Sequence, residues 1–114
     1  MAALSGAFDV CDYMERERVM KAPEWADVFG TRERLLGSRD DLYAMVKTRL
    51  SEGIDLPKLF LTCGKADKLL PDTQRLHELF AAHGVPHAYR ETEGGHSWDL
   101  WDEEIQHVLS YFFG

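Results

Sequence analysis

The chain has 114 residues, of which 45% are hydrophobic and 29% charged, a composition typical of globular proteins and not of disordered ones. Its 13 Lys and Arg residues against 20 Asp and Glu residues give a net charge of −7, which excludes a surface built to bind the nucleic-acid backbone. No stretch approaches the roughly 20 apolar residues of a membrane span, and no signal peptide is visible at Met1, so we expect a cytoplasmic protein without membrane contact.

The first third of the chain predicts a short strand followed by a helix. Met1 to Leu4 is small-sided and apolar and runs into Ser5-Gly6, which is typical of a buried strand ending in a loop. Pro23 and Gly30 predict a short helix between them, because proline suits the first helical turn and glycine the position after the last. Two cysteines, Cys11 and Cys63, are too few for a disulfide framework, and we expect both to be buried thiols.

A longer helix is expected from Ser38, which we interpret as its N-cap, to Gly53. Its apolar positions recur at helical spacing and predict one buried stripe. They are Leu42, Met45, Val46 and Leu50.

The second half alternates strand and helix. Residues 59–63 form a continuous apolar run, which predicts a strand covered on both faces. Residues 71–83 predict a helix and residues 87–92 a second strand; residues 98–112 predict the last helix. The expected core faces of the two helices are Leu76, Leu79, Phe80 and His83 on one, and Trp101, Ile105, Val108, Leu109 and Phe112 on the other.

This order predicts an α/β fold with about three parallel strands and flanking helices, formed by residues 1–114 as part of one domain. Three parallel strands alone leave an apolar sheet edge unpaired. We therefore expect the sheet to be incomplete. A missing N-terminal half, another subunit or a second copy of the chain would complete it.

Two residues follow neighbouring strands at the point where each strand ends. Asp67 lies in the turn after residues 59–63, and His96 follows Gly94-Gly95 after the next strand. Taken singly, Asp67 could be a turn former and His96 a loop residue. Because sites form beyond the carboxyl ends of parallel strands, we expect the two side chains to meet, with the carboxylate orienting a histidine that acts as general base.

The other candidate residues are weaker. His77 and His107 are expected to be solvated, and His83 with His87 lacks the further ligands of a zinc site, so we expect no metal. Ser5 lacks the flanking glycines of a nucleophile elbow and is rejected as the nucleophile. Trp98 and Trp101 are interpreted as packing residues and not as a ligand platform.

The motifs around these residues resemble the C-terminal half of an α/β-hydrolase of the putative esterase family, and within it the tributyrin esterases and S-formylglutathione hydrolases (esterase D). The resemblance covers nearly the whole chain. The segments that carry it are Leu4-Ser5-Gly6-Ala7-Phe8-Asp9, Phe29-Gly30, Asp41-Leu42-Tyr43-Ala44, Leu59 to Asp67, and Gly94-Gly95-His96-Ser97-Trp98 with Trp101.

The resemblance implies hydrolysis of a small carboxylic ester or thioester through an acyl-serine intermediate, without a cofactor. Asp67 would be the acid of the triad, and His96 its general base and then its general acid. The Gly-x-Ser-x-Gly elbow of the family and its oxyanion-hole loop are absent from the sequence. We therefore expect this chain to be inactive alone and its full-length parent to be an active serine carboxylesterase. The alternative is a non-catalytic α/β module that associates through its open sheet edge.

Overall fold

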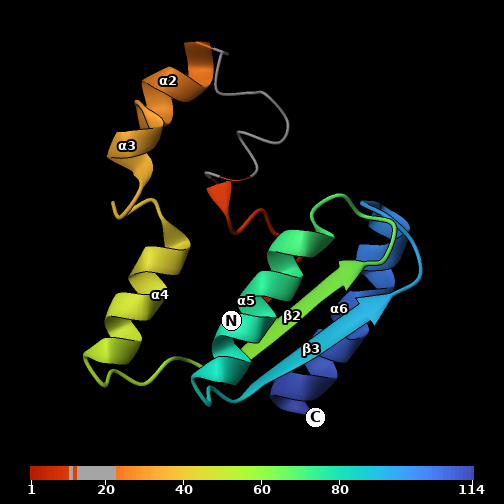
Figure 1. The fold of residues 1–114 in the computed structure, drawn as a ribbon. Helices are drawn as coiled ribbons and strands as arrows, with labels where there is room; N and C mark the ends of the chain where they lie inside the picture. The colour runs from red at the N-terminus through yellow and green to blue at the C-terminus, as the bar shows by residue number, and fades with distance from the viewer. Residues whose placement is uncertain (11, 13–22) are drawn as a thin grey trace. The chain divides into compact units, whose positions relative to one another are not determined.

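The computed structural model describes residues 1–10, 12 and 23–114. The chain forms two compact units, one of residues Met1–Gly6 with Leu56–Gly114 and the other of residues Ala7–Asp55. The sheet lies in the first unit, and Figure 1 labels two of its strands, β2 and β3. The expectation for Cys11 lies outside the described residues, whereas Cys63 is a buried free thiol as predicted.

The sheet has three parallel strands in the order β1-β2-β3. They are β1 (Ala2–Leu4), β2 (Leu59–Gly64) and β3 (His87–Thr92). Every residue of β2 is buried, because this apolar strand is central in the sheet and covered on both faces. The predicted parallel α/β arrangement is confirmed. Among the described residues, no strand pairs with the outer edge of β1.

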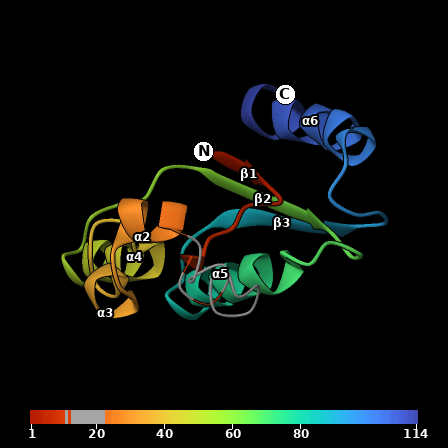
Figure 2. The same ribbon diagram turned by 90° about the horizontal axis from the view of Figure 1, so that it is seen from above.

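Helices α5 (Leu70–Ala82) and α6 (Trp98–Phe113) cover opposite faces of this sheet, as Figure 2 shows. Helix α5 has Pro71 in its first turn and buries Leu76 and Phe80. The placement of His83 on its core face is wrong. That residue is exposed just beyond the helix, where its Nδ1 lies 2.9 Å from the carbonyl oxygen of Leu79, which also accepts the backbone N–H of His83 at 3.2 Å.

The face of α6 that meets the sheet differs from the predicted one. The buried residues of the helix are Leu100, Glu104 and Val108, whereas Ile105 and Leu109 are 36% and 46% exposed. The prediction is right for Val108 and wrong for Ile105 and Leu109, because it considered apolar residues alone. Glu104 is instead buried.

Glu104 is held by partners on two strands. Its carboxylate accepts hydrogen bonds from Thr62 Oγ1 at 2.7 Å and from Arg90 Nε and Nη2 at 3.0 and 3.2 Å. Burial acts to raise the pKa of Glu104, but the hydrogen bonds from Arg90 and Thr62 outweigh it, so the carboxyl pKa lies below its ordinary value. The ion pair therefore fastens α6 to β2 and β3.

The second unit is helical in its described part, with α2 (Pro23–Phe29), α3 (Arg32–Leu35) and α4 (Leu42–Ser51). Leu35 is its buried centre, packed by Val10, Trp25 and Phe29. The short helix between Pro23 and Gly30 is confirmed.

The N-cap expected for α4 is corrected by the structure. The helix starts three residues later than predicted, because Asp41 and not Ser38 is its N-cap. The Asp41 carboxylate accepts the Ala44 N–H at 3.2 Å, which satisfies a free donor of the first turn. Of the expected stripe, Val46 is buried and Met45 is 40% exposed. In the described ranges, no helix is long and apolar enough to cross a membrane.

Replacing Glu104 with Gln should lower the free energy of unfolding by about 1–3 kcal/mol near neutral pH, because the buried charge that Arg90 binds is lost. The folded-state pKa is lowered, so the charge stabilises the fold above the unfolded-state pKa of about 4.3 and this contribution is lost as the pH falls through the folded-state pKa. Urea denaturation should show a difference between the two proteins that shrinks toward pH ~3. Glu103→Gln, exposed on the same helix, is the matched control. An equal difference in unfolding free energy at neutral pH and at pH ~3 would show that the charge of Glu104 does not stabilise the fold.

Candidate active site

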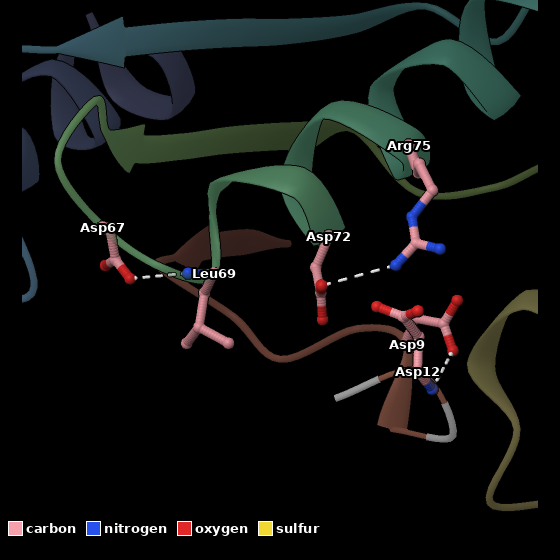
Figure 3. Close-up of polar contacts among 6 residues, drawn as sticks. All are labelled: Asp9, Asp12, Asp67, Leu69, Asp72 and Arg75. Atoms are coloured by element: carbon pink, nitrogen blue, oxygen red, sulfur yellow. Dashed lines mark hydrogen bonds and ion pairs between the residues drawn. The ribbon is translucent and has the colours of Figure 1, made fainter. Parts of the chain in front are cut away.

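Asp67 is held in the turn that follows β2. Its backbone N–H donates to Gly64 O at 3.0 Å. Its Oδ1 accepts the Leu69 N–H at 2.9 Å, a contact that Figure 3 shows. The residue is 5% exposed. One carboxylate oxygen is therefore used to build the turn, which fixes the direction of the other.

That other oxygen meets His96. The distance from Asp67 Oδ2 to His96 Nδ1 is 2.9 Å, and the two side chains differ sharply in exposure, with 0% for the aspartate and 52% for the histidine. A carboxylate only accepts, so Nδ1 carries the proton and donates it. Neutral His96 then has a free acceptor at Nε2, on the ring edge away from the carboxylate. The predicted meeting of the two side chains is present; their role in catalysis stays a prediction.

The two loops that carry these side chains are bonded to one another through their backbones. Lys65 N–H donates to Thr92 O at 2.8 Å, and Ala66 N–H donates to Gly94 O at 2.9 Å. Gly64 lies so close to Gly94 that a Cβ on Gly64 would overlap the carbonyl group of Gly94. The acid and the histidine are therefore spaced by main-chain contacts.

The two glycines before His96 differ in whether the backbone requires a glycine. Gly94 has a φ of 116°, which disfavours any residue with a side chain. At Gly95 a Cβ would meet only Ala66 O, at an ordinary 3.9 Å. The backbone therefore requires a glycine at position 94 but not at position 95.

Two further residues surround His96 that the sequence did not identify as part of the site. Trp101 packs its ring against the imidazole, with 4.7 Å between centroids and 89° between planes. Its Nε1–H donates to Ser5 Oγ at 3.0 Å. Ser5 is 4% exposed and has a φ of 54° at the end of β1, an uncommon backbone conformation for a residue other than glycine. Ser5 and Trp101 are 96 positions apart, so sequence patterns among nearby residues do not predict their contact.

Trp98 was expected to pack in the core, and that expectation is wrong. Its side chain is 80% exposed and contacts Trp101 edge to face, with ring centroids 5.2 Å apart. It occupies the first position of α6, beyond the part of the helix that faces the sheet. Trp101 is a packing residue as predicted, but it packs against His96.

The other histidines lie elsewhere. His107 is exposed as predicted, but His77 is half-buried, with its Nδ1 2.7 Å from His87 Nε2 and its ring stacked on Tyr89. In the described ranges of the chain, no group of three or more potential ligands could hold a metal ion. His83 and His87 have separate partners.

Gly64→Ala should destabilise the protein by about 1–3 kcal/mol and displace the His96 loop, because the added methyl group meets the rigid carbonyl group of Gly94 as well as the side chain of Leu100. Thermal unfolding measures the loss, and the His96 ring resonances in NMR spectra report the displacement. Gly95→Ala is the matched control, since its methyl group has room. Unchanged His96 resonances in a folded Gly64→Ala protein would show that this contact does not space the loops.

Known proteins with a related sequence or structure are esterases and other serine hydrolases. No protein-family model matches the chain. Over 84 residues it is 33% identical to an acetyl esterase of Caldicellulosiruptor saccharolyticus, which covers 74% of this chain and 32% of that protein.

The structure is similar to that of S-formylglutathione hydrolase of Staphylococcus aureus, with a TM-score of 0.78 and 22% identity over 96% of this chain and 42% of the other. It is equally similar to FphF, a fluorophosphonate-binding serine hydrolase of the same organism, with a TM-score of 0.78 and 21% identity over 96% and 42% of the two chains. The chain thus spans about a third to two fifths of the length of these relatives. By fold and sequence likeness, the chain forms part of an α/β-hydrolase fold and is similar to the esterase and the serine hydrolases named above.

Proposed function

We propose that the chain is part of a serine esterase and supplies two of the three residues of its catalytic triad, Asp67 as the acid and His96 as the base. The observation that carries the proposal is the 2.9 Å contact between Asp67 Oδ2 and His96 Nδ1 beyond the carboxyl ends of neighbouring parallel strands. This contact fixes the tautomer that a general base needs.

In the proposed reaction, His96 Nε2 takes the proton of a serine hydroxyl as the serine oxygen attacks the carbonyl carbon of the substrate. The buried carboxylate of Asp67 stabilises the imidazolium that forms. His96 then gives the proton to the departing alcohol or thiol, which leaves an acyl-serine. A water molecule, deprotonated by the same Nε2, releases the carboxylic acid and restores the serine.

The substrate class follows from the relatives and from this chemistry. One relative is named for acetyl esters and another for the thioester S-formylglutathione. An Asp-oriented histidine serves oxygen and sulfur leaving groups alike, since each leaves with one proton. We propose a small carboxylic ester or thioester as the substrate, without a cofactor.

The nucleophile should come from a further polypeptide segment, because the sequence contains no Gly-x-Ser-x-Gly. Two features support a partner of this kind. Among the described residues the outer edge of β1 has no strand beside it. In addition, α6 exposes large apolar side chains at spacings of seven, four and four positions, which place them on one helix face. They are Trp98, Ile105, Leu109 and Phe113.

The chain alone should show no hydrolysis of p-nitrophenyl acetate above the background. Hydrolysis should appear when the chain is joined to the segment encoded directly upstream of Met1, which we expect to carry the nucleophile. In that joined protein, His96→Ala should lower kcat by about 10⁴-fold or more and Asp67→Asn by a comparable factor. His107→Ala, which changes an exposed histidine on α6, is the control and should retain activity. An inactive joined protein, or an active one indifferent to His96→Ala, would refute the proposal.

The open edge of β1 and the exposed face of α6 also favour a second candidate, a non-catalytic module that pairs with a copy of itself. The two candidates differ in solution. A discrete dimer of the chain that persists after the upstream segment is joined would support the module. Conversion of the self-associated chain to a monomeric active protein would support the esterase.

A further inference from the structure

The contacts around His96 form a network of side chains that reaches back to the sheet. Asp67 binds Nδ1 of the imidazole, Trp101 packs against the ring, and Trp101 in turn donates its indole N–H to Ser5. Cys63 ends the buried strand next to this site, and the side chains of both Ser5 and Asp67 influence the pKa of its thiol. These five side chains come from the ends of β1 and β2, the two loops and α6.

Ser5 is held in place by the sheet. Its backbone N–H donates to Thr62 O at 2.9 Å, and its side chain is buried at the end of β1. A φ of 54° sets the direction of its Cβ and therefore of its hydroxyl. The Trp101 indole thus bonds to an oxygen that the sheet holds in place.

The hydrogen bond to Asp67 alone does not fix the orientation of the His96 imidazole. Asp67 contacts a single ring atom, Nδ1, and the histidine side chain is 52% exposed. A ring held at one atom can still swing about its terminal bond, since that torsion is broad for histidine. Trp101 stands perpendicular to the imidazole and limits this swing.

Burial raises the pKa of the Cys63 thiol, and the nearby Asp67 carboxylate acts in the same direction. The thiol therefore stays protonated and neutral at neutral pH.

We propose that Trp101 is a positioning residue for His96, and that Ser5 is the anchor through which the sheet sets the angle of the imidazole. The catalytic meaning of this arrangement depends on the proposed esterase function, but the arrangement can be measured without it. Its effect is to keep Nδ1 protonated toward Asp67 and Nε2 aimed at the position of the substrate.

The test measures the tautomer of His96 in the chain by long-range proton–nitrogen NMR spectra of the imidazole. In the unaltered chain the tautomer with the proton on Nδ1 should dominate. Trp101→Phe keeps an aromatic ring and removes the indole donor, whereas Ser5→Ala removes the acceptor. Each should lower the ratio of the Nδ1–H to the Nε2–H tautomer by about two- to tenfold, the range expected for one hydrogen bond. The double variant should be no worse than the more affected single variant, because both changes break the same bond.

Two further variants keep the result decisive. Ser5→Gly also removes the hydroxyl and suits the φ of 54°, so it replaces Ser5→Ala if that variant fails to fold. Trp98→Phe is the matched control, because Trp98 contacts Trp101 but is 80% exposed. The proposal is overturned by a tautomer ratio that stays within twofold in folded Trp101→Phe and Ser5→Gly proteins. An equal change in Trp98→Phe would also overturn it.

These outcomes are separate from those of the proposed function. A shifted tautomer ratio in a chain that gains no esterase activity when joined to its upstream segment would support the positioning role and refute the esterase. An active joined protein whose Trp101→Phe and Ser5→Gly variants keep the tautomer ratio of the unaltered chain would support the esterase and refute the positioning role.

Discussion

The close approach of two backbone loops is the constraint on which the candidate site depends. Gly64 and Gly94 are in contact where β2 and β3 end, and main-chain hydrogen bonds from Lys65 and Ala66 join the same loops. These backbone contacts set the distance between side chains on the two loops. The hydrogen bond between Asp67 and His96 is a consequence of that spacing, which is why a lone buried carboxylate can be aimed at a half-exposed imidazole.

The order of strands and helices and the meeting of Asp67 with His96 were predictable because each depends on local signals. The apolar run of β2 has the composition of a doubly covered strand, and proline and glycine mark the ends of α5. Once the strands are known to be parallel, both loops must leave the sheet at the same edge. The two residues then lie close together whatever the details of the helix between them.

Other features were not predictable, because they arise from partners far apart in the sequence. The face of α6 was misjudged since Glu104 is buried by Arg90 and Thr62, and a charged residue on a helix is otherwise placed in solvent. The start of α4 was misjudged because Ser38 and Asp41 are both good caps, and only the hydrogen bond to Ala44 distinguishes them. Ser5 and Trp101 became part of the site only through a contact between opposite ends of the chain.

The Asp67 and His96 side chains meet across only 29 positions of sequence, with one helix and one strand between them. Such a pairing has a small loop-closure entropy, because few residues separate the two side chains in the sequence. The contact between Asp67 and His96 is therefore local in the sequence, whereas the contacts of Trp101 with His96 and Ser5 bring in residues outside that segment.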